Sequence, residues 1–413
     1  MPIILIRNIG LLTGIHNPSA PLRNQQLAEL PTLMNAFLLV EDDTIVSYGE
    51  LRNLPATWAN IESIDAAGGI VLPAWCDSHT HLVYPASREN EFIDKLRGKT
   101  YAEIAANGGG ILNSSARLQT ASDDELFASA WTRLTEVSAM GTGAIEIKSG
   151  YGLTVESEIR MLRVIKKLKQ KSALIIRSTF LGAHTYPVMF HDNHQGYINQ
   201  IIHEMLPVIA AEQLADFIDV FCERSYFSPS ETEQICRAGM ALGLKAKIHA
   251  NQFGESGGVE AGIDLNAISV DHLENVGDGT IQKLAASDTI GTLLPTAAYF
   301  LRMPFQPARK LIDAGCAIAL ASDYNPGSSP SGNMNIVVSM SCIQMRMLPS
   351  EAINAATING AFAMDAAKLA GSISVGKKAN LILTRPVPSL NYLPYSFGTD
   401  QISKVMINGN WVR

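Results

Sequence analysis

Apolar residues recur with two different periods over the central part of the chain. Short apolar runs alternate with longer segments in which apolar residues return every three or four positions. The short runs predict strands, and the longer segments, such as Ser122–Met140 and Val155–Lys169, predict helices. The eight predicted strands are Ile70–Cys76, Ala144–Lys148, Leu174–Leu181, Phe217–Cys222, Lys245–His249, Ala267–Val270, Thr289–Leu294 and Ala317–Ala321. Eight strand–helix units in series predict an α/β protein with a closed (β/α)8 TIM-type barrel rather than an open sheet.

The two ends of the chain show a different pattern. Residues 1–69 contain short apolar runs separated by Asn, Gly, Asp and Pro, which predicts a small β-structure. The tail, residues 371–413, returns to short strand-like runs, in KKANLILT and KVMINGNWV. We therefore predict a discontinuous β-sandwich module built from residues 1–69 and 371–413, and a barrel domain over residues 70–370.

Composition and charge narrow the functional classes. The 413 residues are 47 % apolar and 17 % charged, which suits a large barrel with an accessory module. The net charge is −7, with acidic and basic residues interspersed, so we expect no nucleic-acid-binding face. An acidic protein that binds an anionic substrate needs a cationic side chain within its site.

Nothing in the sequence predicts export or a membrane span. The first residues, MPIILIRNIGLLTG, resemble a first strand rather than a signal peptide. The longest uncharged stretch, residues 326–345, is rich in Ser, Asn and Gly, which excludes a membrane helix. The odd number of widely spaced cysteines, with no CxxC, favours reduced thiols in a cytoplasmic protein: Cys76, Cys222, Cys236, Cys316 and Cys342.

The strongest chemical signal is the segment Asp77-Ser-His79-Thr-His81 at the end of the first barrel strand. Residues two apart in a strand point the same way, so His79 and His81 can bind one metal ion from one side. An isolated HxH would be read as two ordinary histidines. The position of this motif favours metal binding, because active sites of such barrels lie at the carboxyl ends of the strands.

Three further polar residues end apolar runs in the same way. His249 ends the fifth predicted strand, His272 the sixth and Asp323 the eighth. Imidazoles plus a carboxylate, with a position left for water, make a catalytic metal site rather than a structural one.

These residues stand in motifs that resemble the amidohydrolase superfamily and, more closely, the imidazolonepropionases. The motifs are DSHTHLVYPASRENEF, GGGIL, EIKSGYGL, TFLGAH, DVFCE, HANQF, DHLE, LLPTAAYFL and SDYNPGSSP. The resemblance implies one zinc or iron ion per chain, bound by His79, His81, His249 and Asp323, with His272 beside the water. Lys148 follows the second strand, whereas the bridging lysine of binuclear relatives follows the fourth, so we predict a structural or peripheral role for it.

The resemblance also implies the reaction, which is hydrolytic ring opening of 4-imidazolone-5-propanoate to N-formimidoyl-L-glutamate. A bound ion supplies hydroxide at neutral pH, and Asp323 takes the proton and passes it to the leaving nitrogen. The metal or His272 polarises the ring carbonyl. Arg88 matches the carboxylate-binding arginine; the alternative is a surface arginine paired with Glu89 or Glu91. The remaining expected substrate contacts are Tyr101, Tyr151, His184, Gln252, Asn325, Gly327 and Ser328.

Gln252 stands where related deaminases place a proton-shuttling glutamate. Glutamine only donates and accepts hydrogen bonds, so the acid–base role rests on Asp323 and His272. The first competing interpretation is another cyclic amidase or deaminase of the same superfamily that acts on a small nitrogen heterocycle. Gln252 and Arg88 together argue against such an enzyme acting on a neutral base. The second, a non-catalytic relative, usually loses metal ligands, and all four are present here.

Other expectations concern the rest of the chain and its partners. His191, His194 and His203 lack a supporting carboxylate, so we predict exposed histidines rather than a second metal site. We expect a homodimer that binds a small anionic heterocycle, no nucleic acid and no membrane.

Overall fold

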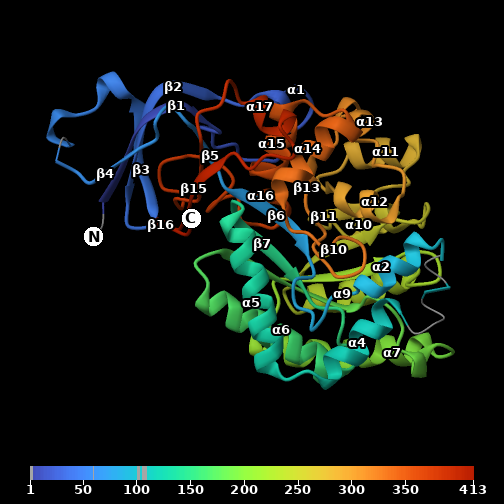
Figure 1. The fold of residues 1–413 in the computed structure, drawn as a ribbon. Coiled ribbons are helices and arrows are strands. Elements are labelled where there is room, and N and C mark those ends of the chain that lie inside the picture. Colours follow the sequence, from blue (N-terminus) through green and yellow to red (C-terminus); the bar gives the residue numbers. More distant parts are fainter. Residues whose placement is uncertain (1–2, 59, 100–102, 105–108) are drawn as a thin grey trace.

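Eight parallel strands form the predicted barrel in a computed structural model that describes residues 3–58, 60–99, 103–104 and 109–413 (Figure 1). The strands are β6 (Trp75–Thr80), β7 (Thr142–Lys148), β8 (Ile175–Ala183), β9 (Phe217–Cys222), β10 (Lys245–Ala250), β11 (Ser269–His272), β12 (Ile290–Leu293) and β13 (Ile318–Leu320). Each strand pairs in parallel with the next. Two backbone hydrogen bonds join the ends, from Asp323 to His79 (3.0 Å) and from His81 to Tyr324 (2.9 Å).

Helices cover the outside of the barrel (Figure 1). The principal ones are α2 (Glu89–Leu96), α4 (Gly110–Thr120), α5 (Asp123–Ala139), α6 (Val155–Lys171), α7 (His194–Gln200), α8 (Leu206–Glu212), α9 (Pro229–Ala241), α10 (Gly258–Asp264), α11 (Asp278–Ala285), α12 (Pro295–Leu301), α13 (Ala308–Ala314), α14 (Met334–Met345), α15 (Pro349–Ala356) and α16 (Ile358–Ala363). Helix α5 begins at a capping box in which Ser122 and Glu125 satisfy each other's backbone N–H groups. Its buried residues, Leu126, Ala130, Leu134 and Val137, recur every three or four positions and face the barrel.

A second sheet combines strands from both ends of the chain, as predicted. It contains β1 (Ile3–Thr13), β2 (Thr32–Glu41), β3 (Thr44–Glu50), β4 (Ser63–Asp65), β5 (Ile70–Pro73), β14 (Leu381–Thr384), β15 (Ile402–Ile407) and β16 (Asn410–Trp411). Their order is β16-β15-β14-β5-β1-β2-β3, with β4 paired to β1. The antiparallel pairing of β5 with β14 therefore joins the two terminal parts. They share a core that includes Ile6, Leu38, Val71, Leu381 and Met406.

The apolar run Ile70–Cys76, predicted as one barrel strand, is divided between the two sheets. Its first part is β5 of the terminal sheet, and β6 of the barrel begins at Trp75. The change takes place at Ala74, whose N–H donates to Asn380 O (2.9 Å), while Trp75 N–H donates to Gly141 O (2.9 Å). The prediction of one strand was therefore wrong, because adjacent backbone groups pair with different sheets.

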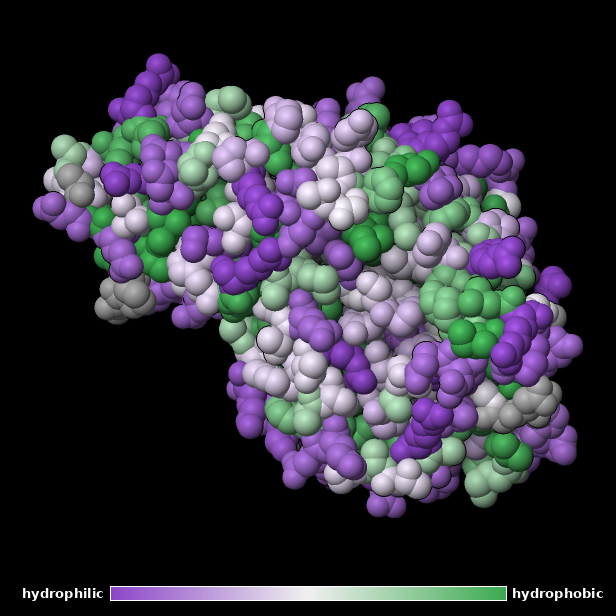
Figure 2. Space-filling view, viewed as in Figure 1, coloured by the Kyte–Doolittle hydropathy of each residue, from purple (hydrophilic) through white to green (hydrophobic). Residues whose placement is uncertain are grey.

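Mostly hydrophilic side chains cover the visible surface, and an apolar cluster lies around α2 and α12 (Figure 2). Within the described part of the chain, no helix combines the length and the hydropathy needed to cross a membrane. All five cysteines are free thiols.

Candidate active site

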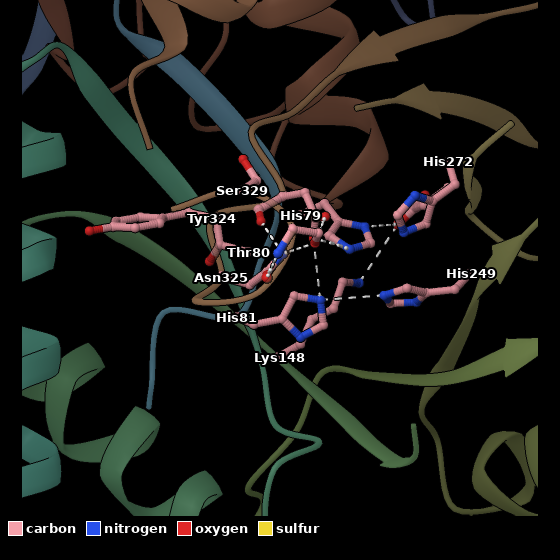
Figure 3. Close-up of polar contacts among 12 residues, drawn as sticks. His79, Thr80, His81, Lys148, His249, His272, Tyr324, Asn325 and Ser329 are labelled. Carbon is pink, nitrogen blue, oxygen red and sulfur yellow. Dashed lines mark hydrogen bonds and ion pairs between the residues drawn. The ribbon is translucent and has the colours of Figure 1, made fainter. Parts of the chain in front are cut away.

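Three imidazoles converge at the carboxyl end of the barrel (Figure 3). Nε2 of His81 lies 3.4 Å from Nε2 of His249. Oδ1 of Asp323 lies 3.5 Å from Nε2 of His79 and 3.6 Å from Nε2 of His81. All four residues are buried. Distant strand ends therefore bring the predicted ligand set together, as expected for a barrel active site.

The protonation and orientation of these histidines suit metal binding. Burial lowers the pKa values of His79, His81 and His249 below the ordinary value, so their imidazoles are neutral. Nδ1 of His79 lies 2.7 Å from Oδ2 of Asp271, and Nδ1 of His249 lies 2.9 Å from Oδ2 of Asp219. The hydrogen bond with Asp271 fixes the tautomer of His79 in which Nε2 keeps its lone pair, and the close Asp219 carboxylate favours the same tautomer of His249.

One atom provides a test of whether a metal fits. Nε2 of His79 is buried and has no hydrogen-bond partner among the described residues. An unpartnered buried acceptor is costly unless an ion or another donor satisfies it. Because it faces Oδ1 of Asp323 and the other imidazoles, the donor set fits a divalent metal ion.

A layer of buried charges lies directly beneath the imidazoles. Nζ of Lys148 is 2.6 Å from Oε1 of Glu146 and 2.8 Å from Oδ2 of Asp219. Nζ of Lys247 forms an ion pair with the other oxygen of Glu146 and donates to Ser78 O at 2.9 Å. The side chains of both lysines and their carboxylate partners are fully buried. Lys148 thus belongs to an ion network in the barrel, which agrees with the structural role predicted for it.

His272 and Asp323 approach the imidazoles from sharp backbone turns. Their φ angles are +90° and +53°, a region that non-glycine residues adopt at a cost and that is frequent at functional sites. Burial lowers the pKa of His272, but the charges of Glu274, 3.4 Å from its Nδ1, and of Asp323 and Asp271 together more than offset this effect, and the pKa is raised. Burial raises the pKa of Asp323 to about 6, and Ser328 Oγ donates to its Oδ2 at 3.0 Å.

A pocket opens onto this cluster and contains most of the predicted substrate contacts. The predicted residues that line it are His81, Arg88, Tyr151, His184, His249, Gln252, His272, Asp323, Asn325, Gly327 and Ser328. Ile111, Phe221, Phe253 and Leu301 supply its apolar wall. Tyr101 lies outside the described residues. Among its described lining residues, the pocket therefore presents one cation, Arg88, to a ligand that can also reach the histidine cluster.

The whole chain matches known proteins. The model of the amidohydrolase family matches residues 70–412. An imidazolonepropionase of Flavobacterium johnsoniae is 53 % identical over 408 residues, which cover 98 % of this chain and 99 % of the relative. An imidazolonepropionase of Christiangramia forsetii is 50 % identical over 410 residues, covering 99 % and 100 %.

The chain belongs to the imidazolonepropionases of the amidohydrolase family. Solved structures share the fold at much lower identity. A triazine hydrolase variant has a TM-score of 0.74 and 16 % identity, covering 99 % of this chain and 94 % of the other. An adenosine deaminase from Xanthomonas campestris with bound zinc has a TM-score of 0.69 and 16 % identity, covering 99 % and 92 %. At these identities, the likeness shows the fold alone.

In this family member, Arg88 is a buried residue of the pocket wall. It is 7 % exposed, and it pairs with Glu91, so the predicted alternative of a surface arginine is wrong although the ion pair itself is present. Gly327 packs against it, since a Cβ added there would lie 2.3 Å from Nη1 of Arg88. Residue 327 therefore has to be glycine for the guanidinium to keep this position.

Tyr151 stands on a loop that one buried carboxylate holds. Glu158 of α6 accepts hydrogen bonds from the backbone N–H groups of Gly150 (3.1 Å), Gly152 (2.6 Å) and Leu153 (3.0 Å). Nδ1 of His184 lies 3.0 Å from Gly150 O. The Glu158 carboxylate thus fixes the loop that places Tyr151 and His184 at the pocket.

Asn325 organises the loop after β13. Its Oδ1 accepts from the N–H groups of Gly327 and Ser328, both at 2.8 Å, and its Nδ2 donates to Asp323 O at 2.6 Å. Gln252 is 6 % exposed and lines the pocket, as expected for a substrate contact.

The sequence interpretation missed the carboxylates that support the site. These residues are Glu146, Glu158, Asp219, Asp271 and Glu274. Two pairs carried a signal, since Glu146-Ile-Lys148 and Lys247-Ile-His249 place charged or polar residues two apart inside apolar strands. His191, His194 and His203 are exposed, as predicted. The expected lack of a carboxylate is wrong for two of them, since Nδ1 of His191 lies 3.1 Å from Asp192 and Nδ1 of His194 lies 3.3 Å from Glu231.

Proposed function

We propose that this chain hydrolyses 4-imidazolone-5-propanoate to N-formimidoyl-L-glutamate. Relatives at 50–53 % identity over nearly the whole chain carry the name imidazolonepropionase. The structural observation that carries the proposal is a single pocket lined by both Arg88 and the histidine cluster. A small ring with an anionic side chain matches this combination of groups.

The residues proposed to hold one zinc or iron ion per chain are His79, His81, His249 and Asp323. The ligand atoms of His79, His81 and His249 form one close group, and their imidazoles are neutral, which supports the assignment. Oδ1 of Asp323 lies 3.5 Å from Nε2 of His79 and 3.6 Å from Nε2 of His81. When bound, such an ion supplies hydroxide near neutral pH by lowering the pKa of water from about 15.7 to about 7. Imidazole and carboxylate ligands suit zinc and iron alike.

Asp323 is proposed to accept the proton of the attacking water and to return it to the leaving ring nitrogen. Its Oδ1 lies beside the imidazoles and its Oδ2 accepts a hydrogen bond from Ser328 Oγ at 3.0 Å, so the carboxylate is placed to take a proton from water at the cluster. His272, oriented by Glu274, faces the same space and donates a hydrogen bond to the ring carbonyl oxygen. Gln252 supplies only hydrogen bonds.

Arg88 is proposed to bind the propionate group of the substrate. Its planar guanidinium suits a carboxylate, and binding there orients the ring toward the histidine cluster. Tyr151, His184, Ser328 and the backbone of the Asn325 loop contribute the remaining contacts, and Tyr101 is proposed to join them.

An assay of the purified, metal-loaded protein tests this function. Freshly prepared imidazolonepropionate should lose its ultraviolet absorbance while formiminoglutamate accumulates. Metal analysis of the same sample should give one ion per chain. Release of ammonia from a neutral base such as guanine, without turnover of imidazolonepropionate, would favour the deaminase alternative instead.

The proposal extends to the state of the protein. We propose a homodimer in the cytoplasm that binds no nucleic acid. The free cysteines support the cytoplasmic location. The net charge of −7 supports the absence of nucleic-acid binding. Light scattering during size-exclusion chromatography would measure the oligomeric state.

A further inference from the structure

The histidine cluster rests on two buried lysines that do not face the pocket. Lys148 lies on β7 and Lys247 on β10, two residues before His249. Both side chains are fully buried, and each forms an ion pair with Glu146. Neither lines the pocket, so their place in the site is indirect.

Each supporting carboxylate of the histidines is also a neighbour of a lysine. Oδ2 of Asp219 lies 2.9 Å from Nδ1 of His249 and 2.8 Å from Nζ of Lys148. Oδ2 of Asp271 lies 2.7 Å from Nδ1 of His79. The same oxygen is 3.7 Å from Nζ of Lys148 and 3.8 Å from Nζ of Lys247.

Other contacts fix the two carboxylates from the opposite side. Oδ1 of Asp219 accepts from the backbone N–H of His249 at 3.1 Å, and Oδ1 of Asp271 accepts from Ser269 Oγ at 2.5 Å. One oxygen of Asp219 is thus held by the neighbouring strand β10, and one oxygen of Asp271 by its own strand β11. The other oxygen of each carboxylate is shared between an imidazole and a lysine.

We propose that Lys148 and Lys247 are positioning residues that hold the Asp219 and Asp271 carboxylates against Nδ1 of His249 and His79, and so set the affinity for the metal. The inference rests on the metal site proposed above. A charge without its counterion is strongly unfavourable in a fully buried position. Without the lysine, Asp219 would turn away from His249 or draw in water, and the imidazole would lose its fixed orientation.

The test compares Lys148→Met with a matched control, Lys377→Met. Lys377 is also buried, but it donates to Ser372 Oγ (2.8 Å) and Ala370 O (3.3 Å) and contacts none of the four proposed metal ligands. Metal affinity is measured by competition with a chelator, and ligand geometry by the visible spectrum of the cobalt(II)-loaded protein. We expect Lys148→Met to weaken metal binding about 10- to 100-fold and to alter the cobalt spectrum, as second-layer changes do. Lys377→Met should retain wild-type affinity and spectrum.

Wild-type affinity and spectrum in folded Lys148→Met, with only a lower melting temperature, would overturn the inference. If Lys148→Met does not fold, the double variant Glu146→Gln/Lys148→Met is measured, because it preserves the net charge of the network. The same 10- to 100-fold loss is expected there, and wild-type affinity would again overturn the inference. These measurements need no substrate, so a failure to turn over imidazolonepropionate would contradict only the proposed reaction.

Discussion

Arg88 donates from Nε to Oε2 of Glu91 at 2.9 Å, and its Nη2 contacts the same oxygen. The other oxygen of Glu91 accepts from the backbone N–H of Gly110 at 3.2 Å. Glu91 therefore connects the first turn of α2 and the first residue of α4 to one edge of the guanidinium. The Nη1 edge packs on Gly327 at the pocket. This arrangement holds the only predicted carboxylate-binding cation in a fixed orientation before substrate arrives, which lowers the entropic cost of binding.

Replacing Arg88 should impair substrate binding while leaving the metal site intact. An interaction with a charged group contributes about 1.5–3 kcal/mol, so Arg88→Met should lower kcat/KM by roughly 10- to 150-fold. Part of the loss should appear in kcat, because the anchor positions the ring. Arg88→Lys should recover only some of it, since a point charge does not reproduce the planar fork. Steady-state kinetics with metal content measured in parallel checks this.

Glu91→Gln is the control for the ion pair. It keeps Arg88 and removes only the charge that orients it, so we expect a smaller loss of kcat/KM than in Arg88→Met. If Arg88→Met keeps the wild-type kcat/KM, the ion pair between Arg88 and Glu91 is a purely structural contact. The main physical support for an anionic substrate is then removed.

Asp323→Asn should stop turnover far more completely than it disturbs the fold. The change removes both a charged ligand and the proposed proton acceptor, and general acid–base catalysis alone contributes about 10²- to 10⁴-fold. We expect less than about a hundredth of the wild-type kcat, with an unchanged circular dichroism spectrum. If Asp323→Asn binds one metal ion per chain and keeps more than about a hundredth of the wild-type kcat, another group accepts the proton.

Glu158→Gln tests how the substrate loop is held. The carboxylate accepts three backbone N–H groups, and an amide oxygen replaces only part of that capacity. Since hydrogen bonds to a charged group contribute about 1.5–3 kcal/mol, KM should rise roughly 10-fold through displacement of Tyr151 and His184. Metal affinity should stay unchanged because Glu158 contacts none of the ligands. If KM is unchanged and only the melting temperature falls, Glu158 contributes to the stability of the fold and not to substrate binding.

The features that the sequence predicted correctly are those that local pattern determines. The barrel strands from β7 to β13 overlap the predicted apolar runs, and His249, His272 and Asp323 stand at the ends of such runs. The carboxyl ends of parallel strands in a closed barrel meet on one face, so residue type and position sufficed to place the cluster. The pairing of β5 with β14 does not follow from local pattern, because the two strands lie more than 300 residues apart in the chain.

The supporting residues were missed for two reasons, since the loop partners of Glu158 lie within eight residues of it in the chain whereas the histidine partners of Asp219 and Asp271 are distant. Glu158 belongs to a helix with ordinary amphipathic spacing, and nothing near it in the sequence shows that its carboxylate accepts from the loop at Gly150. Asp219 and Asp271 point into the barrel, and their partners, His249 and His79, lie on other strands. Pairing of the neighbouring strands β9 and β10 brings Asp219 to His249, and closure of the barrel brings Asp271 to His79.

The buried imidazole of His16 makes the stability of the folded chain depend on pH. Burial, and then the charge of Lys377, lower the pKa of His16 from 6.5 to about 4 in the folded chain, and its buried Nε2 has no hydrogen-bond partner among the described residues. The unfolded chain therefore binds more protons between pH 6.5 and pH 4, so this contribution to stability is complete above pH 6.5 and is lost as the pH falls toward 4. His16→Gln should remove it, and the urea midpoint should fall less between pH 7 and pH 4.5 than in the wild type. Parallel curves for both proteins would contradict a neutral His16, because every other titrating group is common to the two.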